Sequence, residues 1–165
     1  MTQKRPRRLS GPGSVPWLTA EGALDFRRFP IDVPTRQCVD PSAEAFGHGC
    51  RFLGSMASHG RVDAGIFLLG LLRYYEQDLG AATIVVESLA EFQDPRCAAA
   101  LFGELHRVTS SNTTRRYLDT VIKSLSRLPA DMVQERFTAL SRETAFSYKM
   151  RAKFRDVAEM IAGHW

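Results

Sequence analysis

The sequence has few cysteines and no long apolar run. Its three cysteines are an odd number in 165 residues, and the basic residues 4–8 are followed by Gly, Pro and Ser rather than by an apolar stretch, which argues against a secretory leader. We therefore expect reduced thiols in a cytoplasmic protein instead of a disulfide framework. The longest apolar run, residues 62–72, is interrupted by Asp63 and is shorter than the ~20 residues that a membrane span needs.

Local signatures of catalysis are also missing. The chain has no Gly-x-Ser-x-Gly elbow that would present a nucleophilic serine, and no Gly-rich loop that would hold phosphates. Its four histidines, at positions 48, 59, 106 and 164, are dispersed, and His106 falls near the end of a predicted helix, where a cation suits the helix dipole. We therefore expect no enzymatic activity and no cofactor.

Four residues in the segment 38–59 have the chemistry of zinc ligands, namely Cys38, His48, Cys50 and His59. Structural zinc sites usually place their cysteines in closely spaced pairs, whereas here only His48 and Cys50 are close in sequence. A metal site is therefore not expected. We interpret Cys50 and Cys97 as small apolar residues of a core.

An internal repeat is the clearest positive feature of the sequence. The composition, 44% hydrophobic and 24% charged, suits a soluble domain with a core. The run VVESLAEF, residues 85–92, returns thirty-six residues later as VIKSLSRL, residues 121–128, with its apolar positions kept and with Glu87 and Glu91 replaced by Lys123 and Arg127. Helical segments that recur every ~20 to 50 residues are typical of α-solenoids, in which each helical pair buries its apolar side against its neighbours.

The apolar periodicity predicts helices near residues 43–56, 62–75, 81–92, 95–108, 113–128, 131–142 and 147–162. The first of them contains Gly47, Gly49 and Gly54, each of which weakens a helix by ~0.5–1 kcal/mol relative to Ala. Asp94 followed by Pro95 is a favoured start signal for the fourth. Residues 61–162 would then form three antiparallel helical hairpins.

Residues 92–103 resemble the inter-repeat signature of HEAT-type repeats. In that signature a turn with Asp-Pro and Arg, here Asp94 to Arg96, leads into a helix of small residues that ends in Leu and Gly, here Leu101 and Gly103. The resemblance implies a right-handed superhelix of antiparallel helical pairs whose concave side binds extended partners. Residues 60–63 and 128–131 do not repeat the Asp-Pro-Arg turn, and an irregular helical bundle is the alternative fold.

Residues 1–41 differ in composition from the rest of the chain. They hold six of the eight prolines and show no helical period, so we predict an extended or partly disordered basic arm before a helical-repeat domain at residues 42–165. Residues 29–34 alternate like a short edge strand or a peptide that lies in a groove. Trp17, Phe26 and Phe29 are candidate docking residues, which could cover one end of the helical core or bind another protein. The Arg-rich start leaves an organellar transit segment as an alternative.

The charge of the chain is unevenly distributed. Residues 37–106 carry four Lys or Arg against nine Asp or Glu, whereas residues 107–155 carry eleven against four. Two predicted helices hold most of this excess, and corresponding helices of neighbouring hairpins could line one continuous basic strip. The candidate partner-binding residues are Arg115, Arg116, Lys123 and Arg127 on the first helix and Lys149, Arg151, Lys153 and Arg155 on the second.

Besides a solvated face that binds no partner, the basic strip has three interpretations. The first is an acidic or extended protein partner, which would make the chain a non-enzymatic scaffold or adaptor and a subunit of a larger complex. The second is nucleic acid, with Tyr117, Tyr148 and Phe154 available to stack on bases and with salt-dependent binding. The third is self-association, in which acidic residues between 76 and 94 of one copy meet the strip of another.

Overall fold

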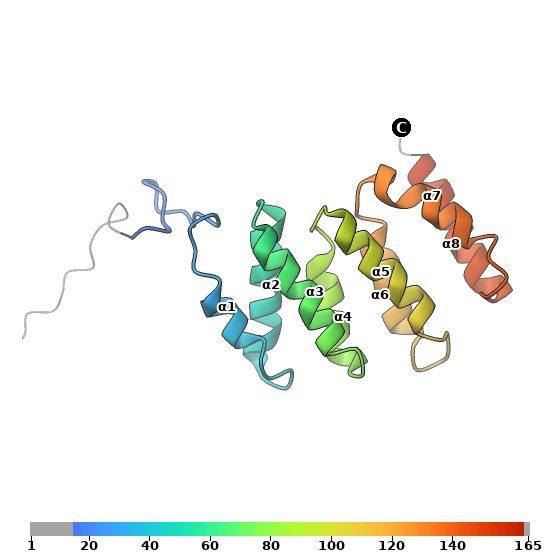
Figure 1. Cartoon of the computed structure of the whole chain (residues 1–165), viewed down its shortest axis with the longest axis horizontal. Coiled ribbons are helices and arrows are strands. Elements are labelled where there is room, and N and C mark those ends of the chain that lie inside the picture. Colours follow the sequence, from blue (N-terminus) through green and yellow to red (C-terminus); the bar gives the residue numbers. More distant parts are fainter. Residues whose placement is uncertain (1–14, 164–165) are drawn as a thin grey trace, which may run out of the picture.

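The computed structural model describes residues 15–163, and within this span the chain forms α-helices and no strand. The all-α fold class predicted from the sequence is confirmed. The helices follow one another along the long axis of the molecule (Figure 1). None of those in the described span is both long and apolar enough to cross a membrane. Their bounds are α1 (Asp32–Gln37), α2 (Glu44–Ser58), α3 (Val62–Tyr74), α4 (Leu79–Leu89), α5 (Pro95–Arg107), α6 (Arg115–Leu125), α7 (Ala130–Leu140) and α8 (Tyr148–Ala162).

The helix starts follow local chemistry. The Asp94 side chain accepts a hydrogen bond from the backbone N–H of Arg96 at 2.8 Å, and Pro95 occupies the first helical position, so the predicted start of α5 is confirmed. Asp78 caps α4 and Ser147 caps α8 in the same way. Each cap satisfies a backbone N–H that has no partner within its own helix.

The helices pack in two rows. In one row α2 contacts α4 and α4 contacts α6, and in the other α3 contacts α5 and α5 contacts α7. Consecutive helices join the rows, because α2 packs on α3, α3 on α4, α5 on α6 and α7 on α8. The apolar side chains between the rows form one continuous core from Cys38 to Ile161.

The two copies of the sequence repeat occupy equal environments on α4 and α6. Val85 and Val121 are both buried, as are Leu89 and Leu125, and the two serines that align between them are buried as well. Residues 92 and 128, which follow the two helices, are also in the core. The residues that align in the sequence therefore have similar burial in the two helices.

Glycines allow α2 to contact its neighbours closely. A Cβ on Gly54 would lie 2.4 Å from the carbonyl oxygen of Ser88 in α4, and a Cβ on Gly49 would lie 2.8 Å from the carbonyl oxygen of Pro34 in α1. These glycines weaken α2 as an isolated helix, as expected from the sequence, but they also let α1 and α4 approach it closely.

The segment 29–34 was expected to be a short edge strand or a peptide that lies in a groove. The strand is wrong, because α1 begins at Asp32 and residues 29–31 form no strand. Pro34 is tolerated in the first turn of a helix, where its missing N–H is not needed. An ion pair between Asp32 and Arg36 (3.2 Å) spans one turn, and Pro34 and Cys38 are buried against α2. The packing of α1 on α2 outweighs the alternating pattern. The division at residue 41 between an arm and a helical domain stays a prediction.

Alanine substitution at three helical glycines tests this packing. We expect Gly54→Ala to lower the free energy of unfolding, because its Cβ would overlap the Ser88 carbonyl. Gly70→Ala and Gly103→Ala, where a Cβ meets nothing within 4 Å, should raise it by up to ~1 kcal/mol through helix propensity. Urea denaturation of the three variants measures both effects. If Gly54→Ala is as stable as the two controls, the α2–α4 contact is not close.

Candidate interaction surface

The outer side of α6 presents three cations together. The helix buries its apolar stripe of Tyr117, Leu118, Val121, Ile122 and Leu125, which leaves the opposite side in solvent. Arg115, Arg116 and Lys123 are all exposed and fall within a sector of about 100° around the helix axis, since each residue advances the helix by about 100°. These three residues form what we call the basic face.

One acidic residue, Asp119, lies within the same sector of α6, but its carboxylate does not pair with the cations of the basic face. Arg115 donates a hydrogen bond to the amide oxygen of Asn112 (3.1 Å). None of the three cations of the basic face forms an ion pair within the described part of the chain. Asp119, the acidic residue of α6, pairs instead with the Lys153 ammonium group of α8. The basic face borders a hollow of about 370 Å³ whose lining is Asn112, Arg115, Arg116, Asp119, Thr120 and Lys123.

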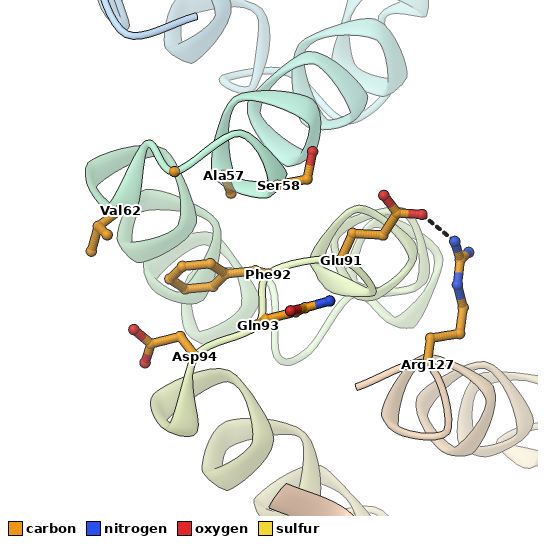
Figure 2. Close-up of a pocket in the computed structure, with 9 residues that line it drawn as sticks. Ala57, Ser58, Val62, Glu91, Phe92, Gln93, Asp94 and Arg127 are labelled. Atoms are coloured by element: carbon orange, nitrogen blue, oxygen red, sulfur yellow. Dashed lines mark hydrogen bonds and ion pairs between the residues drawn. The ribbon is translucent and has the colours of Figure 1, made fainter. Parts of the chain in front are cut away.

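Arg127 lies beyond the end of α6 and is already paired. Its guanidinium group donates to the carboxylate of Glu91, which follows α4, as Figure 2 shows. The two residues line one side of a hollow of about 540 Å³, and Ser58, Gly60 and Val62 line another part of it. The sequence predicted Arg127 as a partner-binding residue, but in this conformation an internal carboxylate neutralises its charge.

The cations of α8 lie on two sides of that helix. Its buried stripe consists of Met150, Phe154, Ala158 and Ile161. Lys149 and Lys153 lie to one side of the stripe by helical geometry, and Lys153 reaches Asp119 of α6. Arg151 and Arg155 lie to the other side, where Arg155 borders a hollow with Gln134 and Thr138 of α7. The structure therefore brings Lys153 to α6 and places Arg155 beside α7, and Lys149 and Arg151 lie on the same two sides of α8 as these residues by helical geometry.

Two of the three aromatic residues expected among the cations are in the core. Tyr117 is 2% exposed and Phe154 is fully buried, whereas Tyr148 is 74% exposed. The Tyr117 hydroxyl donates to Glu104 of α5 at 2.6 Å, and burial together with this carboxylate raises the pKa of Tyr117. Arg107 donates to both oxygens of Glu104 (3.0 and 2.6 Å). This buried network joins α5 to α6 and holds the orientation of the basic face.

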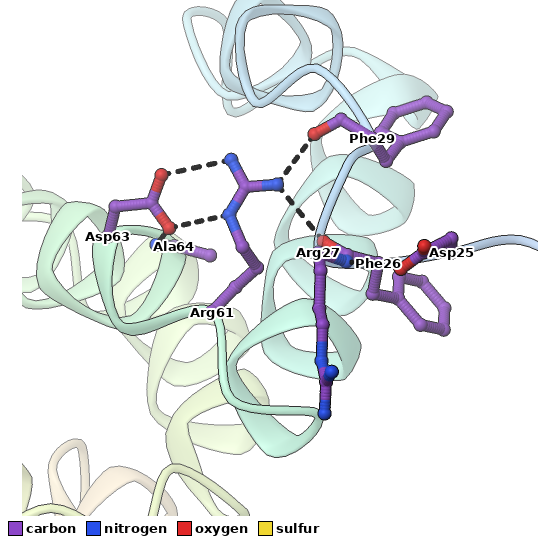
Figure 3. Close-up of polar contacts among 7 residues, drawn as sticks. All are labelled: Asp25, Phe26, Arg27, Phe29, Arg61, Asp63 and Ala64. Atoms are coloured by element: carbon purple, nitrogen blue, oxygen red, sulfur yellow. Dashed lines mark hydrogen bonds and ion pairs between the residues drawn. The ribbon is translucent and has the colours of Figure 1, made fainter. Parts of the chain in front are cut away.

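The predicted arm residues pack within the chain. Phe26 and Phe29 contact Phe52 of α2, with ring centroids 5.6 and 4.9 Å apart, and Trp17 lies edge-on to Phe29 at 6.1 Å. Figure 3 shows that Arg61 donates hydrogen bonds to the backbone carbonyls of Phe26 (3.0 Å) and Phe29 (2.7 Å). The sequence suggested that these aromatic residues either cover one end of the helical core or bind another protein. In the structure they contact one end of the helical core.

Arg61 has a second set of partners. Its Nε and Nη2 groups donate to the Asp63 carboxylate (2.8 and 3.0 Å), and these hydrogen bonds lower the pKa of Asp63. Neither Arg61 nor Glu104 was singled out from the sequence, because each makes contacts with residues far from it in the chain. The only local signal for Arg61 was the acidic residue two positions later.

Two of the possible zinc ligands lie together. The sulfurs of Cys38 and Cys50 are 3.8 Å apart and both side chains are buried. His48 contacts Arg51 and His59 contacts the Ser55 carbonyl, and no third metal-ligating group joins the cysteines within residues 15–163.

Burial raises the pKa of Cys97 to about 12, so its thiol stays protonated at neutral pH.

No protein-family model matches this chain, and no curated protein or solved structure shows significant similarity to it. The chemistry of the surface is therefore the basis for any functional conclusion.

Removing the Arg61 guanidinium tests whether it holds the segment before α1 in place. We expect Arg61→Ala to expose the Phe26 and Phe29 region to chymotrypsin at least several-fold faster, because two hydrogen bonds to that backbone are lost. Arg73→Ala, an exposed arginine of α3, is the matched control. The experiment is limited proteolysis followed by mass spectrometry. Equal cleavage rates in both variants would show that aromatic packing alone holds the segment.

Proposed function

We propose that this chain is a non-enzymatic interaction module, a scaffold or adaptor subunit of a larger assembly, that binds an acidic segment of a partner protein. The observation that carries the proposal is the basic face, in which Arg115, Arg116 and Lys123 are exposed side by side and form no ion pair among the described residues. Lys153 of α8 lies beside the basic face, where its charge is paired with Asp119 of α6.

The proposal includes a short HEAT-like α-solenoid as the scaffold. Two rows of helices joined by antiparallel neighbours, and aligned residues that share the same burial on α4 and α6, support this interpretation. A solenoid presents an extended surface to its partners rather than a deep site. The proposal keeps the cytoplasmic location expected from the sequence, with which three free, buried thiols are compatible.

The surface favours a protein partner over nucleic acid. Single-stranded nucleic acids are held by aromatic side chains on which bases stack, and Tyr117 and Phe154 are buried in the core. Phosphate backbones are held by many cations at once, whereas the basic face consists of three cations. A short acidic segment requires only the few cations of the basic face.

Charge reversal on the basic face tests the proposal directly. We expect Arg115→Glu/Arg116→Glu to bind a fluorescein-labelled acidic peptide of alternating Asp and Glu at least about tenfold more weakly, since each exposed charge contact contributes up to ~1 kcal/mol. The melting temperature should not change, because both side chains are exposed. Fluorescence anisotropy at 50 and 300 mM salt measures the binding.

Arg73→Glu/Arg142→Glu is the control for net charge, because it makes the same change on exposed residues away from α6. If this control loses as much affinity as the double variant of α6, the binding is not localised and the proposal fails. A labelled single-stranded RNA of equal charge serves as competitor. Tighter binding of the RNA than of the peptide would contradict a protein partner.

The proposal also predicts variants that bind more tightly. Glu91 pairs with Arg127, and Asp119 pairs with Lys153. Because exposed ion pairs contribute only ~0–1 kcal/mol, a partner's carboxylates can replace Glu91 and Asp119 in these pairs. We expect Glu91→Gln/Asp119→Asn to raise the affinity for the acidic peptide about threefold to tenfold. Glu135→Gln/Glu159→Gln removes the same charge from exposed residues of α7 and α8. An equal gain in that control would mean that net charge alone decides binding.

A further inference from the structure

A groove runs beside the basic face, between α4 and α6. It has a volume of about 390 Å³, and its lining comes from both helices and from the loop before α6: Leu79, Gly80, Thr83, Ile84, Glu87, Thr113, Arg116 and Tyr117. A water molecule takes about 30 Å³ of liquid. The groove therefore has room for a side chain of a bound segment.

The α4 side of this groove contains an apolar part, formed by Leu79 and Ile84, next to the polar residues Thr83 and Glu87. Leu79 and Ile84 are partly exposed and pack against the core with their remaining surface. Gly80 has no side chain, and a Cβ built on it would meet only the Asp78 carboxylate at 3.4 Å, an ordinary contact distance. Aliphatic surface that stays partly in solvent gains free energy when another apolar group covers it.

The α6 side of the groove is rigid and charged. The ring of Tyr117 is held by the hydrogen bond from its hydroxyl to Glu104, which Arg107 holds in turn. Because the Tyr117 ring is already fixed, it loses little conformational entropy when a ligand binds. Arg116 lines both this groove and the hollow of the basic face, so a group in the groove lies next to a cation.

We propose that the α4–α6 groove is the specificity pocket for the acidic partner, and that it takes an aliphatic side chain which neighbours acidic residues in the partner's sequence. The inference rests on the proposed function and adds a second requirement to it. Charge complementarity with Arg116, Arg115 and Lys123 selects an acidic segment, and the apolar wall of Leu79 and Ile84 selects a segment that also carries an aliphatic residue. Glu87 at the α4 rim disfavours a further acidic residue on that side.

Two labelled peptides of equal charge test the pocket with the full chain. Both alternate Asp and Glu, and one carries a central Leu where the other carries Ser. We expect the Leu peptide to bind about fivefold to tenfold more tightly by fluorescence anisotropy, since an apolar side chain gains affinity when it is buried. Gly80→Leu should abolish this preference by filling the groove, while Gly80→Ala should keep it. Neither substitution enters the core, and a melting curve verifies that both variants fold.

The outcomes separate this inference from the proposed function. If both peptides bind equally and Arg115→Glu/Arg116→Glu weakens both, the pocket is wrong and the acidic partner stands. If neither peptide binds, the proposed function fails. A Leu preference that persists in Gly80→Leu would place the apolar contact elsewhere and overturn the inference. Sedimentation that shows a dimer which Gly80→Leu dissociates would identify a second copy of the chain as the occupant and also overturn it.

Discussion

The packing of α4 in the middle of the molecule is the constraint on which the other helices depend. α4 contacts α2, α3 and α6, and Val85, Val86 and Leu89 have no exposed surface. Gly54 of α2 leaves room for the Ser88 carbonyl of α4. Gly65 of α3 leaves room for the ring of Phe92, a residue that lies just after α4. Because the Gly54 contact is made by the backbone of α4 itself, the spacing of α2 and α4 cannot be adjusted by changing side-chain rotamers.

The same burial decides what α6 presents to solvent. Its apolar stripe packs toward α4 and α5, and the Tyr117 hydroxyl is tied to Glu104 inside the structure. An amphipathic helix held in this orientation has its charged side directed outward. The basic face and the wall of the α4–α6 groove are therefore two consequences of one packing arrangement.

Ion pairs between neighbouring helices reduce the number of available cations. The repeat aligns Glu91 with Arg127, and these two residues meet in the folded chain, while Asp119 and Lys153 join the next pair of helices in the row. Two pairs of opposite charges on neighbouring helical segments thus become internal contacts. The cations that remain unpaired among the described residues form a compact group next to the α4–α6 groove, and the partner that we propose is accordingly a short segment rather than a long polyanion.

The amino-acid sequence by itself determined the helical class, the positions of α2–α8 and the start of α5 at Asp94 and Pro95, because periodicity and capping depend on residues close together in the chain. It did not determine α1, whose six residues are stabilised by contact with α2. Nor did it determine which cations stay available, since Arg127 and Lys153 are neutralised by residues more than thirty positions away. The rotation of α8 about its axis and the distance between helices decided those contacts, and both result from tertiary packing.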